Sequence, residues 1–230
     1  MRRRRRVYAN LGGGFMTKPP SLTPATLRRA EAEISAADKV MAKCIAELGP
    51  LSAEKREPPF QVLAVSIINQ QISQAAADAI ESRVAKIVPQ PFLPQGFLRA
   101  SPTRLRAAGL SMRKVEYLRE LARRADKDII PVSQLSRMDD EEIISILTDA
   151  PGIGQWTAEM FLMFALARPD VVSLGDGALR RAAVNLYGKR FRGNETEVLH
   201  KCSQKWRPWR TVGCRYLWRS LKPRKFAAVK

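Results

Sequence analysis

Asp176, which lies between Gly175 and Gly177, is the residue of this sequence whose type and setting best suit chemistry on a substrate. It stands at the start of a helical pattern, where an acid is poorly suited to a core role. A carboxylate there can stabilise positive charge that develops on a reacting carbon, and it can orient or deprotonate a water molecule. An aspartate at a helix start is also a common N-cap. Position alone favours capping over catalysis.

Other catalytic groups are scarce. His200 is the single histidine, so nucleophile schemes built on Ser-His or Cys-His pairs have little material. The three cysteines, Cys44, Cys202 and Cys214, are too few and too scattered for a disulfide framework, a zinc site or a four-cysteine cluster. We expect the thiols to be buried or to have no chemical role.

A Gly-Ile-Gly turn precedes Asp176 by about twenty residues, in the run Ala150-Pro151-Gly152-Ile153-Gly154. Two alternate glycines let the backbone turn tightly and let an anion approach its N–H groups at the start of the next helix. Ile153, between them, is expected to plug the turn into the core. The alternative is a plain helix-helix corner, which two glycines alone do not exclude.

Four aromatic residues near the carboxyl end are interleaved with arginines. Aromatic side chains at helical spacing form core more often than a ligand platform, but they can also wall a pocket or contact a nucleic acid. We assign Trp206 to a substrate pocket. The stretch contains Trp206, Trp209, Tyr216 and Trp218, with Arg207, Arg210, Arg215 and Arg219 among them.

The formal net charge of +18 is concentrated at the two ends of the chain. Arg2 to Arg6 form one basic run, residues 201–230 hold no acid, and residues 7–200 are nearly neutral. A nucleic acid is the acidic partner that this favours, because each phosphate contact releases a counterion. The alternative is a basic tail that serves solubility.

The elements around these residues read as helices throughout, which predicts an all-α fold. No run approaches the roughly 18 apolar residues of a membrane span, and the first residues lack the apolar core of a secretory signal. Residues 1–20 are expected to be a flexible basic arm, with Met16 as an alternative start. The predicted helices cover 24–48, 60–88 with a break at 69–71, 103–110, 113–125, 139–147, 156–166, 176–187 and 196–221.

Five ordered segments together resemble the helix-hairpin-helix DNA glycosylase superfamily. The hairpin is LTDAPGIGQWTA, and ARPDVVSLGDGALRR follows it with the aspartate of that family's catalytic turn. With FQVLAVSIINQQIS and GLSMRKVEYLRELA upstream and WRPWRTVGCRYLWRSL downstream, the chain is similar to the AlkA-type branch, DNA-3-methyladenine glycosylase II. The resemblance covers roughly residues 22–221.

The resemblance implies roles for backbone groups of the hairpin. The N–H groups of Gly152, Gly154 and Thr157 would hold a DNA phosphate. The carbonyl oxygens of Thr148, Ala150 and Ile153 would hold a monovalent cation, Na⁺ or K⁺, that neutralises it. No other cofactor is expected.

It also implies roles for side chains. Asp176 would be catalytic, and Trp156 would wall the base pocket. Gln71 would enter the duplex as a wedge, although Gln70 and Gln71 could equally cap a helix end. Ser111 and Lys114 would make a second contact with the DNA backbone, for which a solvated lysine is the simpler alternative.

The implied reaction is removal of an alkylated base from double-stranded DNA. Strand-cutting relatives carry a lysine two residues after the last hairpin glycine, where this chain has Trp156. We therefore expect a monofunctional enzyme that leaves an abasic site and uses water as nucleophile. The alternatives are a non-catalytic DNA-binding module, which would not need Asp176, and a glycosylase for oxidised or mismatched bases.

The fold implied has two helical subdomains flanking a cleft. One would combine residues 21–60 with 175–230, and the other would span residues 61–174 and hold the hairpin. We expect a monomer without membrane attachment, in the cytoplasm or nucleoid, or in the nucleus of a eukaryote.

Overall fold

The computed structural model describes residues 21–53, 56–188 and 193–222. Within these ranges every regular element is a helix and there is no strand, so the predicted all-α fold is confirmed. The expected arm at residues 1–20, with Arg2 to Arg6 and Met16, lies outside them. The helices are α1 (Pro24–Ala37), α2 (Lys39–Leu48), α3 (Pro59–Asn69), α4 (Gln74–Ala85), α5 (Pro94–Arg99), α6 (Pro102–Ala107), α7 (Met112–Asp126), α8 (Asp140–Thr148), α9 (Gln155–Met160), α10 (Gly177–Tyr187), α11 (Glu195–Ser203) and α12 (Arg210–Ser220).

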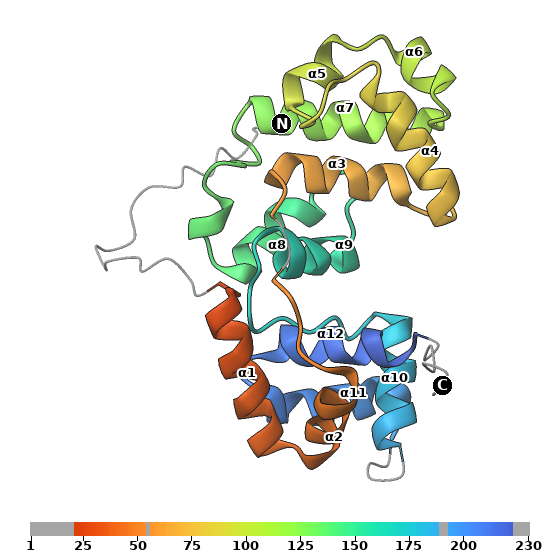
Figure 1. Ribbon diagram of the computed structural model, residues 1–230. Helices are drawn as coiled ribbons and strands as arrows, with labels where there is room; N and C mark the ends of the chain where they lie inside the picture. Colours follow the sequence, from red (N-terminus) through yellow and green to blue (C-terminus); the bar gives the residue numbers. More distant parts are fainter. Residues whose placement is uncertain (1–20, 54–55, 189–192, 223–230) are drawn as a thin grey trace, which may run out of the picture.

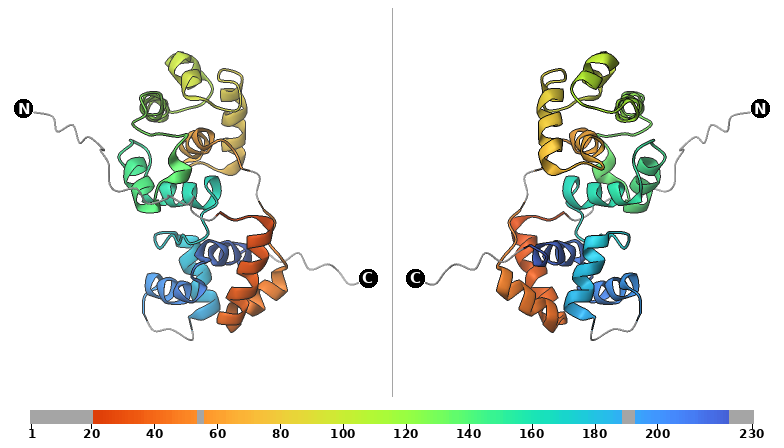
Figure 2. Two further views of the ribbon diagram at one scale, coloured as in Figure 1. Left: turned by 90° about the vertical axis from the view of Figure 1, so that its left-hand side faces the viewer. Right: turned by 90° about the vertical axis from the view of Figure 1, so that its right-hand side faces the viewer.

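The helices form two groups (Figures 1 and 2). In one, α1 and α2 pack beside α10, α11 and α12, although these segments are far apart in the sequence. The other group holds α3 to α9, in which α7 packs on both α3 and α5. The chain crosses between the groups twice, before α3 and again before α10. The second crossing carries Asp176.

The region predicted as one helix over residues 24–48 is two helices, because Asp38 interrupts it. Asp38 is extended (φ −141°) and caps α2, with its Oδ1 accepting the N–H groups of Val40 at 2.9 Å and Met41 at 3.3 Å. Its Oδ2 accepts the hydroxyl of Tyr187 and the indole N–H of Trp206. Helical periodicity continues across the break, so it could not reveal the cap.

The break predicted at residues 69–71 is confirmed, because α3 ends at Asn69 and α4 begins at Gln74. Ser73 caps α4 by accepting the N–H of Ala76 at 3.4 Å. Gln70 and Gln71 therefore form a turn directly after Asn69, the last residue of α3. Helix α9 is shorter than predicted, since residues Phe161–Ala165 continue it as a π-helical turn.

All three cysteines are buried, as expected. Burial raises the pKa of the Cys202 thiol to about 12 and raises that of Cys214 as well, because a thiolate would lose its hydration. Neither thiol is therefore an activated nucleophile. None of the helices in the described part of the chain is long and apolar enough to cross a membrane.

Candidate active site

Asp176 lies where the chain enters α10, and its carboxylate accepts three N–H groups. Oδ1 accepts the backbone N–H of Leu179 at 2.7 Å, which makes Asp176 the N-cap. Two indoles bind as well: Trp156 Nε1 donates to Oδ2 at 2.8 Å, and Trp218 Nε1 donates to Oδ1 at 3.3 Å. Capping and a chemical role are therefore not exclusive, since the cap orients the carboxylate that the indoles hold.

Trp156 has a hydrogen-bonded indole N–H and a side chain that is half exposed to solvent. It lies in the first turn of α9, and 49% of its surface is exposed. Its hydrogen bond ties α9, in one group of helices, to the Asp176 turn that leads into the other. An exposed aromatic face beside a carboxylate is available to stack on a flat ligand.

Trp206 is not part of the pocket, contrary to the sequence-based assignment. Its side chain is fully buried, next to Tyr187 at a ring-centroid distance of 6.3 Å, and its N–H is satisfied by Asp38. The second indole at Asp176 is Trp218, which also packs on Phe164 with ring centroids 5.8 Å apart. Helical spacing places both tryptophans on core-facing positions and does not tell which one borders the site.

Ser173 and Glu159 also hold the Asp176 turn in place, and the sequence did not point to either. The buried Ser173 hydroxyl donates to Glu159 Oε2 at 2.5 Å, and its carbonyl accepts the N–H of Asp176 at 3.2 Å. Glu159 lies one helical turn after Trp156 on the same side of α9. These residues give a second link between α9 and the turn.

The hairpin turn forms as predicted, and its two glycines differ in what they require. Gly152 has φ of 88°, and a Cβ there would lie 2.3 Å from the ring of Tyr117. Gly154 is extended (φ −96°), a Cβ would meet nothing within 4 Å, and it caps α9 without a side-chain hydrogen bond. Gly152 is thus required by the backbone and by Tyr117, whereas Gly154 leaves open space at the helix start.

Several backbone groups of the hairpin lack a hydrogen-bond partner among the described residues. In the described part of the chain, the N–H groups of Gly152, Gly154 and Thr157 have no hydrogen-bond acceptor. Of these residues Gly154 is exposed, Gly152 is half-buried and Thr157 is buried. Unpaired N–H groups at a helix N-terminus are suited to binding an anion. The carbonyls of Thr148 and Ile153 likewise receive no donor among the described residues, while that of Ala150 accepts Ile153 N–H at 3.1 Å. Such oxygens are suitable ligands for a hard monovalent cation.

Lys114 is turned inward, which argues against the predicted contact with a DNA phosphate. Its ammonium donates to the carbonyls of Ile68 at 2.7 Å and Gln70 at 2.8 Å, and burial lowers the pKa of this amine. Ser111 is exposed, and its hydroxyl caps α7 by accepting the N–H of Lys114. A DNA contact by Ser111 stays a prediction.

Gln70 and Gln71 have different environments. Gln70 is half-buried, and its side-chain amide donates to the carbonyl of Gly152 at 2.7 Å. Gln71 is exposed and has φ of 58°, an uncommon conformation for a residue with a side chain. The structure therefore leaves Gln71, and not Gln70, available outside the protein.

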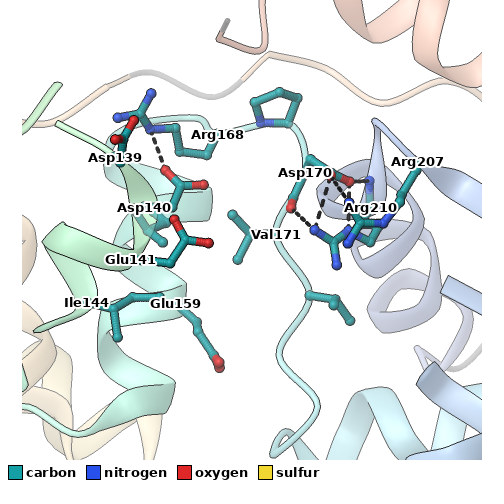
Figure 3. Close-up of a pocket in the computed structure, with 13 residues that line it drawn as sticks. Asp139, Asp140, Glu141, Ile144, Glu159, Arg168, Asp170, Val171, Arg207 and Arg210 are labelled. Carbon is teal, nitrogen blue, oxygen red and sulfur yellow. Dashed lines mark hydrogen bonds and ion pairs between the residues drawn. The ribbon is translucent and has the colours of Figure 1, made fainter. Parts of the chain in front are cut away.

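A cleft of about 480 Å³ lies beside the second crossing segment, but Asp176 does not line it (Figure 3). Arg168 pairs with Asp140 at 3.0 Å, and Arg210 pairs with Asp170 at 2.7 Å (Figure 3). Burial raises the pKa of Asp140, although the Arg168 charge opposes this effect. These ion pairs attach the crossing segment to both groups of helices. We therefore interpret the residues that line this cleft as structural.

Comparisons with known proteins identify the family to which the chain belongs. Residues 64–208 match a family described as HhH-GPD superfamily base excision DNA repair protein. DNA-3-methyladenine glycosylase 1 of Schizosaccharomyces pombe is 31% identical over 203 residues, which are 86% of this chain and 89% of the relative.

Solved structures are similar over the same extent. The crystal structure of DNA-3-methyladenine glycosidase from Bacillus halodurans has a TM-score of 0.77 and 38% identity, and the match covers 83% of this chain and 88% of that one. The S. pombe 3-methyladenine DNA glycosylase in complex with abasic DNA has a TM-score of 0.73 and 30% identity, over 84% and 96% of the two chains. The all-helical fold, the hairpin and the aspartate turn thus come together with the family match, and the chain belongs to the HhH-GPD superfamily of base excision DNA repair proteins as a DNA glycosylase.

Proposed function

We propose that this glycosylase removes alkylated bases from double-stranded DNA by hydrolysis and leaves an abasic site. The observation that carries the proposal is the pair of indoles on the Asp176 carboxylate, one of which, Trp156, exposes its ring. The names of the relatives, DNA-3-methyladenine glycosylase and glycosidase, support the substrate class.

In this reaction the bond between C1′ of the deoxyribose and the base nitrogen breaks, and the base leaves with the electron pair. Positive charge develops on the sugar, and the Asp176 carboxylate stabilises it. A water oxygen then bonds to C1′, and its proton passes to the carboxylate or to solvent. An alkylated purine is already cationic, so it departs as a neutral base without a strong general acid.

Trp156 would favour such bases because its ring face attracts a cationic base through a cation–π interaction. A cation over an indole face gains about 0.5 to 2 kcal/mol. The weakened glycosidic bond of the alkylated base supplies the rest of the selectivity. Because tryptophan stands here instead of lysine, no amine at this position attacks C1′, and we infer that the enzyme has no lyase activity.

The hairpin and the turn after α3 would bind the DNA. The N–H groups of Gly152 and Gly154 would hold a phosphate, and the carbonyls of Thr148, Ala150 and Ile153 would hold Na⁺ or K⁺, which would neutralise part of the phosphate charge. Gln71 would fill the gap left by the extruded base, a step that costs a few kcal/mol. We propose that the enzyme acts on DNA as a monomer, in the nucleoid or nucleus.

The test is release of free base from methylated duplex DNA, with separate chromatography of each methylated base. We expect the wild type to release 3-methyladenine and Asp176→Asn to release little. Borohydride trapping should give no covalent complex. Release of base by neither protein would favour a DNA-binding module, and release only from DNA with oxidised or mismatched bases would favour the other alternative. Equal release by both would refute the role of Asp176.

A further inference from the structure

A long-range hydrogen bond attaches the turn at residues 69–73 to the hairpin. Gln70 Nε2 donates to the carbonyl of Gly152 at 2.7 Å, across 82 positions of sequence. Gly152 is the residue whose backbone conformation shapes the hairpin. A shift of one turn therefore either moves the other or breaks this bond.

Lys114 holds the same turn from α7. Its ammonium donates to the carbonyls of Ile68 and Gln70, which lie in the last turn of α3 and at its C-cap. A cation is favourable at a helix C-terminus, where carbonyls lack helical partners. The same α7 carries Tyr117, whose ring lies against Gly152. Helix α7 thus contacts both turns.

These contacts determine where Gln71 sits. Its φ of 58° is unfavourable for a residue with a side chain and persists only if neighbouring contacts hold the backbone. The neighbouring contacts are those of the Gln70 carbonyl with Lys114 and of the Gln70 amide with Gly152. The side chain of Gln71 makes no hydrogen bond to the described part of the chain and is exposed.

We propose that Gln70 and Lys114 are positioning residues that lock the 69–73 turn to the hairpin, so that Gln71 enters the duplex at a fixed distance from the phosphate held by the hairpin. This inference rests on the proposed function. Neither residue touches the reacting atoms. Loss of either one leaves the phosphate grip and the Asp176 turn in place and allows Gln71 to move.

The test uses a duplex with a tetrahydrofuran abasic analogue and 2-aminopurine in the facing position of the other strand. Insertion of a side chain beside 2-aminopurine changes its fluorescence. We expect Gln71→Ala to abolish the change. Gln70→Ala and Lys114→Met should each lose at least about half of it at saturating protein, with Kd raised no more than about threefold, because the phosphate contacts remain.

A double-mutant cycle separates positioning from an independent role. In single-turnover excision from alkylated duplex, Gln70→Ala should be about tenfold slower than wild type, and the double variant Gln70→Ala/Gln71→Ala no slower than Gln71→Ala alone. Gln95→Ala and Lys43→Met serve as controls for loss of an amide and of an ammonium away from these turns. Thermal melts show whether each variant remains folded.

Three results would overturn the proposal: full fluorescence change in both Gln70→Ala and Lys114→Met, additive rate losses in the cycle, or no fluorescence change in the wild type. The fluorescence measurement needs no excision. A wild type that releases no alkylated base, while the two variants lose the fluorescence change, would therefore refute the proposed substrate and leave the positioning role intact.

Discussion

Two turns of this protein lead into helices: the hairpin turn at residues 150–154 precedes α9, and the aspartate turn at residues 173–177 precedes α10. The two helix N-termini differ in whether a side chain caps them. Gly154 caps α9 without a side chain, and the backbone N–H groups there stay open in the described structure. Asp176 caps α10 with its carboxylate, which then also accepts two indole N–H groups. An open helix start attracts an anion, whereas a capped one holds an anion of its own.

Under the proposed function, the two turns would act on neighbouring parts of one DNA strand. The unpaired N–H groups of the hairpin would bind a phosphate without any basic side chain. The negative charge of Asp176 would stabilise the positive charge that develops on the sugar. The links from α9 to Asp176, through Trp156 and through Glu159 and Ser173, keep these opposite groups at a constant spacing.

The largest expected effect comes from removing the charge of the aspartate turn. Asp176→Asn should lower the single-turnover rate of base release by about 100- to 1000-fold, because the carboxylate acts mainly on the transition state. Asparagine is also a good N-cap, so the melting temperature should change little. Binding of abasic-analogue DNA should persist. A rate within twofold of wild type would show that the turn only caps α10.

The two hairpin glycines should respond differently to alanine. Gly152→Ala should destabilise the protein by about 1 to 3 kcal/mol, because alanine is strained at positive φ and its Cβ meets Tyr117. Gly154→Ala should leave unfolding by urea nearly unchanged, since a Cβ there meets nothing within 4 Å. It should instead weaken DNA binding, by keeping the phosphate away from the open N–H groups. Equal losses of stability in Gly152→Ala and Gly154→Ala would contradict the claim that only Gly152 is required by the fold.

Removing the indole donors tests how far Asp176 depends on them. Trp156→Phe and Trp218→Phe keep an aromatic ring and lose one N–H bond to the carboxylate. A hydrogen bond to a charged group is worth about 1.5 to 3 kcal/mol, so each variant should be at least about tenfold slower in single turnover. Trp209→Phe, at a tryptophan that bonds Glu33 instead, is the matched control. Unchanged rates would leave the N-cap bond alone to orient the carboxylate.

The smallest effect concerns salt. Each phosphate that a Lys or Arg side chain neutralises contributes about −0.9 to the slope of log binding constant against log salt concentration. The proposed hairpin contact uses backbone N–H groups and no basic side chain, so replacing its phosphate by a neutral methylphosphonate should weaken binding by wild type while changing the slope by less than about one unit. For Gly154→Ala the same replacement should weaken binding less. For Asp176→Asn the methylphosphonate should affect DNA binding as it does for wild type. A different effect would mean that Asp176 also contributes to binding this phosphate.

Local chemistry in the sequence was enough to predict several parts of this protein. Apolar periodicity predicted an all-helical fold, and the polar run Asn69-Gln70-Gln71 predicted the end of α3, because neither depends on distant contacts. The glycines at 152 and 154 and the acid at 176 marked both turns, since a tight turn and a helix cap are short-range features.

Only the tertiary structure decided which side chains meet at these turns. Trp206 and Trp218 are twelve positions apart on helical segments, but one bonds the buried Asp38 and the other bonds Asp176. The sequence suggested that Lys114 is a surface cation, but in the structure its ammonium donates to one carbonyl in α3 and one at its C-cap. Side-chain partners more than a helical turn apart depend on how helices pack, and sequence spacing carries no record of that packing.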